Sequence, residues 1–235
     1  MNKTIIYTII TGNYDTIKQP LVLTPGADYF LFTNNSHIRE AGVWKVVEIP
    51  LLNIEGRTEK ENNILLSRRV KILAHEYLPQ GYDVSVYVDA DMLLKESLSE
   101  LLGTMADSSL MAACRHSYCA SVRLEINDLI NKGMVDAHQV EQQWQRYVDW
   151  GFEDNFGISE NGLLIRRHNE PSVIELMELW WKEYQQGCLR DQVSLMPCIH
   201  RTGFMAYFQF IEMDIRKNNM LKVLRHNEYG QGDKE

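Results

Sequence analysis

The sequence lacks several features that would assign it to broad classes of protein. No apolar run reaches the roughly 18 residues of a membrane-spanning helix. The first residues contain one short apolar stretch interrupted by threonine and no small-residue cleavage site, so a signal peptide is not expected. The 24 Lys and Arg residues are outnumbered by 32 Asp and Glu, and the net charge of −8 argues against a general nucleic-acid-binding surface.

Cysteine is scarce, and its positions fit neither a disulfide framework nor a common zinc site. Cys114, Cys119, Cys188 and Cys198 include no pair separated by two residues. We therefore expect reduced thiols in a cytoplasmic protein. The sequence also lacks internal repeats and any linker rich in Pro, Gly or Ser, so its 235 residues are expected to form a single domain.

Short β-rich segments alternate with helical segments along most of the chain. We expect strands at residues 3–10, 28–33, 44–49, 84–88, 110–114, 162–166 and 205–211. Helices are expected at residues 58–78, 98–105, 120–148 and 171–187, and another is expected to start near residue 191. This alternation predicts an α/β fold whose mostly parallel sheet is covered on both faces.

The most informative segment is an apolar strand that runs directly into two aspartates, VSVYVDADM at residues 84–92. In extended backbone, residues i and i+2 project to the same side, so Asp89 and Asp91 can address one point. Ligands of open α/β sheets bind beyond the carboxyl ends of the strands. A divalent cation, Mn²⁺ or Mg²⁺, would relieve the repulsion between the carboxylates and bind substrate phosphates. The competing interpretation makes both aspartates turn or helix-capping residues.

Six segments together resemble GT-A-fold glycosyltransferases, in which Asp-x-Asp after an apolar strand is the hallmark of nucleotide-sugar use. More specifically, the chain resembles a bacterial member of the glycosyltransferase-like family whose plant members act in cell-wall and mucilage metabolism. The segments are YTIITGNYD (7–15), DYFLFTNN (28–35), SRRVKILAHEYLP (67–79), VYVDADM (86–92), ENGLLIRRHN (160–169) and LWWKEYQQGCLRDQVSL (179–195). Residues 120–155 lie outside the resemblance, and acceptor contacts are expected there.

The resemblance implies one Rossmann-like GT-A domain over residues 1–235, with a nucleotide-binding part at about 1–115 and an acceptor-side part at about 116–235. It places the nucleoside at the turn after the first strand, where Gly12 permits close backbone approach beside Thr11, and Tyr14 stacks on the base. Asn34 is a weaker candidate for a base or ribose contact. The alternative is an ordinary strand-to-loop turn.

Three cations precede the aspartate strand. Helical spacing places Arg68 and Lys71 on similar faces and Arg69 elsewhere. The resemblance nevertheless favours Arg69 and Lys71 as the residues that contact the nucleotide-sugar and stabilise charge on its leaving group. The alternative is a solvated basic face paired with Glu59 and Glu61.

The remaining candidates follow from the resemblance. Asp191 is expected to face the acceptor or the transferred sugar, as a general base or as a hydrogen-bond acceptor, with Glu160 as its rival. Asp191 could instead be only a helix N-cap. His226 is the first choice for a third metal ligand, with His200 second, and His116 is expected to reach a hydroxyl of the donor or the acceptor.

These residues predict a metal-dependent glycosyltransferase. Its donor is expected to be a nucleotide-sugar, with UDP the nucleotide by family habit, and Asp89 is expected to contact both donor and metal. Its acceptor is expected to be a hydroxyl of a surface polysaccharide or glycolipid at the cytoplasmic face of a membrane, which would be the protein's route to peripheral membrane contact. A nucleotidyltransferase or phosphatase is one alternative, although no GxxxxGK[ST] run is present. A non-catalytic nucleotide-sugar-binding protein is the other.

Overall fold

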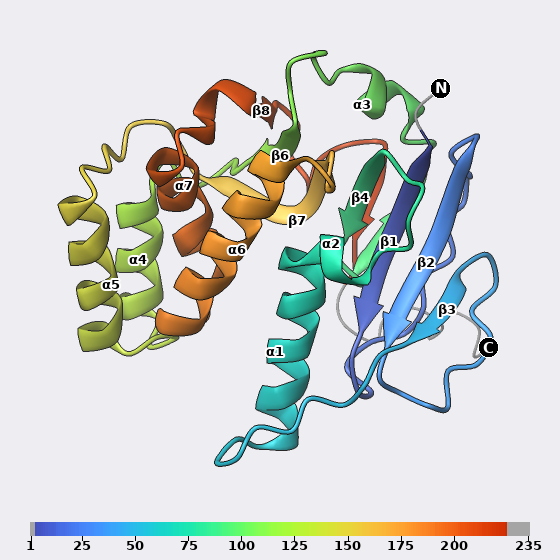
Figure 1. Ribbon diagram of the computed structural model, residues 1–235, viewed down its shortest axis with the longest axis horizontal. Coiled ribbons are helices and arrows are strands. Elements are labelled where there is room, and N and C mark those ends of the chain that lie inside the picture. Colours follow the sequence, from blue (N-terminus) through green and yellow to red (C-terminus); the bar gives the residue numbers. More distant parts are fainter. Residues whose placement is uncertain (1–2, 225–235) are drawn as a thin grey trace.

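A seven-stranded mixed sheet runs through the centre of the protein in the computed structural model, which describes residues 3–224 (Figure 1). The strand order is β3-β2-β1-β4-β7-β6-β8. β7 is antiparallel to both of its neighbours, and the other neighbouring pairs are parallel. The strands are β1 (Thr4–Ile10), β2 (Ala27–Thr33), β3 (Lys45–Glu48), β4 (Val84–Val88), β6 (Met111–Arg115), β7 (Ser159–Arg166) and β8 (Phe208–Ile211).

Helices flank this sheet, and a small antiparallel ribbon of β5 (Met92–Leu94) and β9 (Leu221–Val223) lies beside it. The helices are α1 (Glu59–Ile72), α2 (Ala74–Tyr77), α3 (Ser99–Gly103), α4 (Val122–Asn131), α5 (Ala137–Asp149), α6 (Pro171–Gln186) and α7 (Asp191–Arg201). α6 packs against both α1 and α7 (Figure 1). The mostly parallel mixed sheet flanked by helices confirms the predicted fold class.

The central strand β1 is buried along its whole length because both faces of the sheet are covered. On one face, Ile5 and Tyr7 belong to the core that contains residues of α1, α6 and α7. On the other face, Ile6 and Ile10 pack with residues of α3 and the β5–β9 ribbon. Burial on both sides explains why this strand reads as a nearly continuous apolar run.

Several predicted elements differ from the observed ones. The helix expected over residues 58–78 is interrupted at Leu73, where the backbone leaves helical geometry, and it forms α1 and α2. The helical region 120–148 divides into α4 and α5 around Gly133, which has a φ of 64°. The strand expected over residues 205–211 begins as a 3₁₀ turn and pairs only in its second half. β5 and β9 were not predicted, because three residues are too few to show a period.

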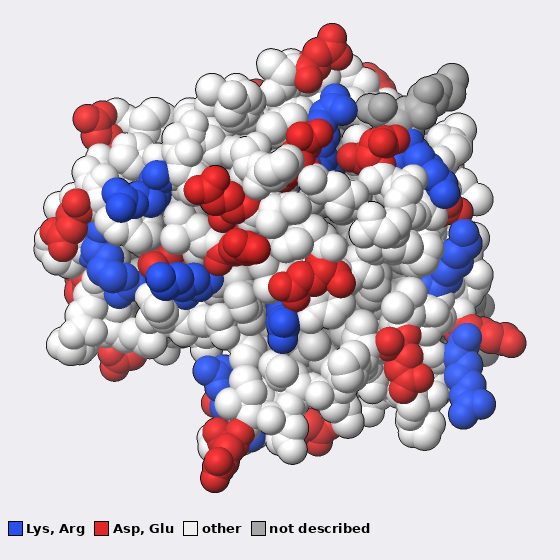
Figure 2. Space-filling model, viewed as in Figure 1, with Lys and Arg blue, Asp and Glu red and all other residues white. Residues whose placement is uncertain are grey.

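The direction of β7 brings several candidate residues to one edge of the sheet. The carboxyl ends of β1, β2, β4 and β6 and the amino end of β7 lie at this edge, since β7 runs opposite to the strands beside it. On the face shown in Figure 2, Lys and Arg side chains are interspersed with Asp and Glu. Within residues 3–224, no helix is both long and apolar enough to cross a membrane.

Leu164 lies at the centre of β7 and is fully buried in the core shared with the helices. We expect Leu164→Ala to lower the free energy of unfolding by about 2–5 kcal/mol, because it removes apolar contacts and leaves a cavity. Leu51→Ala is the control, since Leu51 is 71% exposed and its loss should change stability by no more than about 0.5 kcal/mol. Equal urea midpoints for the two variants would contradict the assignment of β7 to the core.

Candidate functional site

The two aspartates after β4 lie in a tight turn. The Asp89 amide donates to the carbonyl of Gly162 at 2.9 Å, which extends the pairing between β4 and β7 by one residue. The Asp89 carbonyl then accepts from the Met92 amide at 3.0 Å, closing the turn before β5. The extended backbone assumed for Asp89 to Asp91 is therefore wrong, and the alternation rule does not determine where their carboxylates point. The turn still places both residues at the carboxyl end of a buried strand.

The Asp89 side chain occupies space that a glycine leaves open. A Cβ atom at Gly162 would lie 3.1 Å from Asp89 Oδ2 and 2.2 Å from the terminal carbon of Met92. The other Asp89 oxygen accepts a hydrogen bond from the Tyr87 hydroxyl. Burial and the adjacent Asp89 charge raise the pKa of Tyr87 well above its usual value, so the phenol stays protonated and donates. Asp89 remains 30% exposed in its side chain, which leaves it accessible to a ligand.

A buried lysine links this turn to α7. Lys71 Nζ, at the end of α1, lies 2.6 Å from Asp191 Oδ2 and 3.8 Å from Asp89 Oδ1. The ammonium group also lies 4.9 Å from the centre of the Tyr87 ring. Lys71 and Asp191 are both buried, so each charge is stabilised by the other rather than by water. α1, α7 and the end of β4 thus meet at one charged cluster.

Arg68, rather than Arg69, accompanies Lys71 at this cluster. Arg68 Nε lies 3.9 Å from Asp191 Oδ1, and its side chain is 32% exposed. Arg69 instead pairs with Glu76 of α2 at 3.2 Å and is 40% exposed. The structure therefore places Arg69 away from the aspartates, as helical spacing indicates, whereas the resemblance favoured it. The three-residue spacing of Arg68 and Lys71 was the signal that could have selected Arg68.

Asp191 opens α7 but does not act as its N-cap. The N-cap residue is Arg190, and no side chain caps the helix. Burial by itself would raise the pKa of Asp191, but the charges of Lys71 and Arg68 outweigh it and hold that pKa well below its usual range. The Trp180 indole donates to the Asp191 carbonyl at 3.1 Å, fixing the start of the helix against α6. Asp191 is thus an ionised carboxylate held in a defined position.

The turn after β1 is tied to β2 and α1 by side-chain amides. The Gly12 amide donates to Asn34 Oδ1 at 2.7 Å, and Asn34 Nδ2 donates to Asn63 Oδ1 at 2.6 Å. Thr11 Oγ1 donates to the Asn63 carbonyl at 2.9 Å. Gly12 has a φ of 59°, and a Cβ there would lie 2.8 Å from Asn63 Nδ2. Asn34 therefore stabilises this turn through the Gly12 amide. Tyr14, two residues after Gly12, is exposed.

Glu160 and His116 lie farther along the same edge, on neighbouring strands. Glu160, at the amino end of β7, is buried and forms an ion pair with Arg216. Burial raises the pKa of Glu160, although the neighbouring Arg216 and His116 oppose the shift. The His116 amide donates to the Ile158 carbonyl at 2.9 Å, directly after β6. The structure brings these two residues together, but it does not bring Glu160 into the Lys71 pair.

Of the two histidines proposed as metal ligands, the structure describes only His200. His226 lies outside the described residues. The last residue described, Leu224, donates its amide to the Asp91 carbonyl at 2.8 Å. His200 is nine residues beyond Asp191 on α7, about 13 Å along the helix axis, and its ring lies against those of Phe152 and Phe156. That position does not favour His200 as a ligand beside Asp89.

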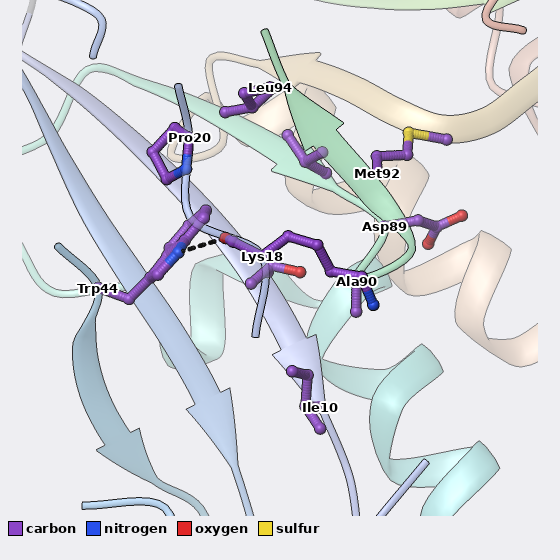
Figure 3. Close-up of a pocket in the computed structure, with 10 residues that line it drawn as sticks. Ile10, Lys18, Pro20, Trp44, Asp89, Ala90, Met92 and Leu94 are labelled. Atoms are coloured by element: carbon purple, nitrogen blue, oxygen red, sulfur yellow. Dashed lines mark hydrogen bonds between the residues drawn. The ribbon is translucent and has the colours of Figure 1, made fainter. Parts of the chain in front are cut away.

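A buried ion pair beneath the aspartate turn was not predicted from the sequence. Figure 3 shows the small cavity that Lys18 lines together with Asp89 and Ala90; its volume of about 10 Å³ is near the minimum for one water molecule. Lys18 is buried and pairs with Asp15, while its carbonyl accepts from the Trp44 indole at 2.9 Å. A lysine in a loop normally indicates solvent exposure, so no sequence signal marked it.

The donor groups at this edge fit a hard divalent cation held mainly by its substrate. Among the residues described, no three His, Cys, Asp or Glu side chains are grouped closely enough to form a metal site by themselves. Mg²⁺ is typically bound through one or two carboxylates, with water and substrate phosphates completing its coordination. Asp89 and Asp91, which lie two residues apart in one turn, are the carboxylates that would contribute to such a partial donor set.

Curated protein sequences contain no significant match to this chain. Structures with a distant likeness are mouse xyloside xylosyltransferase 1 (11% identity, 88% of this chain and 84% of that chain, TM-score 0.47) and the galactosyltransferase LgtC crystallised with donor and acceptor sugar analogs (13%, 88% and 72%, TM-score 0.49). GlyE of Streptococcus pneumoniae is similar over 90% of this chain and 45% of its own (12% identity, TM-score 0.47).

A sequence profile of the TOD1/MUCI70 glycosyltransferase-like domain matches residues 31–226. The match includes the aspartate turn, the Lys71 cluster and Glu160. It confirms both the predicted resemblance and the prediction of a glycosyltransferase enzyme. The chain therefore belongs to the TOD1/MUCI70 glycosyltransferase-like family.

Proposed function

We propose that this protein transfers a sugar from a UDP-sugar to a hydroxyl group of a glycan or glycolipid, using Mn²⁺ or Mg²⁺ held by Asp89 and Asp91. The observation that carries the proposal is the charged cluster at the carboxyl end of β4. There, the partly exposed Asp89 lies 3.8 Å from the buried Lys71, which in turn pairs with Asp191 at 2.6 Å. In a member of a glycosyltransferase-like family, transfer from a nucleotide-sugar releases a diphosphate, and positive charge at that point stabilises its departure.

The cation, when bound, supplies positive charge that neutralises the diphosphate leaving group. Arg68 is the protein's own cation best placed to assist, because its side chain is one-third exposed and only loosely paired with Asp191. A guanidinium binds phosphate oxygens through two parallel hydrogen bonds. Lys71 is buried and cannot move out to contact the diphosphate, so its part is to orient Asp191 and Asp89.

Asp191 supports binding of the sugar more readily than proton abstraction. A general base works best when its pKa lies near the operating pH. The pKa of Asp191 is held well below its usual range by Lys71 and Arg68, so the carboxylate is a weak base at neutral pH. A carboxylate held in place accepts hydrogen bonds from sugar hydroxyls, and this is the part we assign to Asp191.

Asp89→Asn and Asp91→Asn should each reduce Mn²⁺-dependent release of UDP from a UDP-sugar by about 100-fold or more, because each removes a carboxylate that holds the cation. EDTA should abolish release by the wild-type protein. Asp107→Asn, which changes an exposed carboxylate elsewhere, is the control and should retain wild-type release. Unchanged, EDTA-sensitive release by the double variant Asp89→Asn/Asp91→Asn would refute the metal assignment.

Arg68→Gln should raise the Kd for UDP by about tenfold, since it removes a charge-assisted contact to the diphosphate. Arg69→Gln is the matched control one residue away: it breaks an exposed pair with Glu76 and should leave UDP affinity unchanged. Isothermal titration in the presence of Mn²⁺ measures both. The reverse order of effects would restore Arg69 as the phosphate-binding residue.

Asp191→Asn should lower the free energy of unfolding by about 3 kcal/mol at pH 7, because it leaves the buried Lys71 charge with only the partly exposed Asp89, 3.8 Å away, as its partner. The folded-state pKa of Asp191 lies below its unfolded value of about 3.9, so the stabilisation is complete above that pH and is lost as the pH falls through the folded value. The difference between wild type and variant should therefore shrink below about pH 4. Urea unfolding at pH 7 and pH 3 measures it; a constant difference would contradict the ionised pair.

A further inference from the structure

A second hollow lies two strands away from Asp89. It is bounded by residues 115–120, which follow β6, and by residues 155–157, which precede β7. Its volume of about 450 Å³ falls within the roughly 300–1,000 Å³ typical of ligand pockets. The strand order β4-β7-β6 and a spacing of about 4.8 Å per strand place the end of β6 about 10 Å from the end of β4. A ligand in this pocket is within reach of a donor bound at Asp89.

An exposed aromatic ring lies on the wall of the pocket. Tyr118 is 61% exposed. Its hydroxyl donates to Asp214 Oδ2 at 3.1 Å, and Lys217 Nζ lies 5.3 Å from the ring centre. A fixed ring of this kind offers a flat apolar surface at little cost in conformational entropy. The carbon-bound hydrogens on one side of a sugar ring match such a surface.

One residue of the pocket lining, His116, carries a hydrogen-bond donor, and the carboxylate of Glu160 lies beside it. His116 Nδ1 accepts from the amides of Tyr118 at 3.2 Å and Cys119 at 2.9 Å, which in the neutral imidazole assigns the proton to Nε2 as a donor. Glu160 Oε1 is engaged by Arg216, but the buried Oε2 has no hydrogen-bond partner among the residues described. Glu160 is not on the pocket lining, and its buried carboxylate lies beside His116 rather than at the position of a ligand.

The charges around the pocket are already compensated. Arg115 pairs with Glu212 at 2.9 Å and also donates to the Phe156 carbonyl at 3.2 Å. Glu160 pairs with Arg216. Asp214 and Lys217, which both contact Tyr118, also carry opposite charges, so the charged side chains described around the pocket balance and the pocket suits an uncharged ligand.

We infer that this pocket binds a neutral monosaccharide unit of the acceptor glycan, with Tyr118 against the apolar face of the sugar and His116 at one of its hydroxyls. The inference rests on the proposed function, because it makes the pocket the acceptor side of that transfer. It also assigns His116 to the acceptor rather than to the donor.

Binding of simple sugars tests this assignment without knowledge of the natural acceptor. The methyl glycosides of glucose, galactose, mannose and xylose, with methyl glucuronide as the charged comparison, are titrated into the full-length protein and followed by saturation-transfer NMR. At least one neutral glycoside should bind, and methyl glucuronide should bind at least about fivefold more weakly. Tyr118→Ala should weaken neutral binding by at least about fivefold and Tyr118→Phe, which keeps the ring, by less than about twofold.

Tyr207→Ala is the matched control, since Tyr207 is another exposed tyrosine and does not line the pocket. UDP affinity with Mn²⁺, measured on the same samples, should be the same for the wild type and all three variants. Equal glycoside binding by wild type and Tyr118→Ala, preference for the charged glycoside, or no glycoside binding would each overturn the inference. Glycoside binding with the expected Tyr118 dependence but no binding of UDP would contradict the proposed function alone.

Discussion

The contact between Lys71 and Asp191 is the interaction on which the arrangement of the site depends. It joins the end of α1 to the start of α7 at 2.6 Å and keeps Asp89 within 3.8 Å of the same ammonium group. Burying two charges is unfavourable unless they lie close enough to compensate each other. Moving the two helices apart would therefore cost a large free energy, because each charge would lose its partner. The pair therefore fixes the relative positions of three elements that are far apart in the sequence.

Hydrogen bonds from the central sheet fix the end of α1 that carries Lys71. The Tyr7 hydroxyl in β1 donates to the Lys71 carbonyl at 3.2 Å, and the buried Arg166 of β7 donates to Tyr7. Arg166 also donates to the carbonyl of Ile72 at 3.2 Å. The last turn of α1 is thus hydrogen-bonded to the centre of the sheet. The backbone of Lys71 is fixed there, and its ammonium group lies beside Asp191 and Asp89.

The antiparallel strand β7 divides the working edge of the sheet into two parts. On one side, Gly162 makes room for Asp89 and pairs with its backbone amide. On the other side, Glu160 faces Arg216 and the neighbourhood of His116. In the proposed transfer, donor and acceptor would bind on either side of this strand end, and holding both reactants in place is what favours reaction between them.

The sequence predicted what depends on local pattern and missed what depends on packing. Apolar runs and breakers located most of the elements, and the strand before Asp89 located the turn. The split of residues 120–148 needed one glycine to be recognised as a helix end. The pairing of Lys71 with a carboxylate 120 positions later has no local signature. Arg68 was discarded in favour of its neighbour, although helical spacing alone would have selected it, and the buried Lys18 looks like any loop lysine.

In the proposed site, two carboxylates hold a cation whose coordination the diphosphate completes. Titration of Mn²⁺ into the wild-type protein, followed by electron paramagnetic resonance with and without UDP, tests it most directly. Because carboxylates alone leave most coordination positions to water, UDP should raise the affinity for Mn²⁺ by at least about tenfold. An affinity for Mn²⁺ that is the same with and without UDP would contradict this shared coordination of the cation.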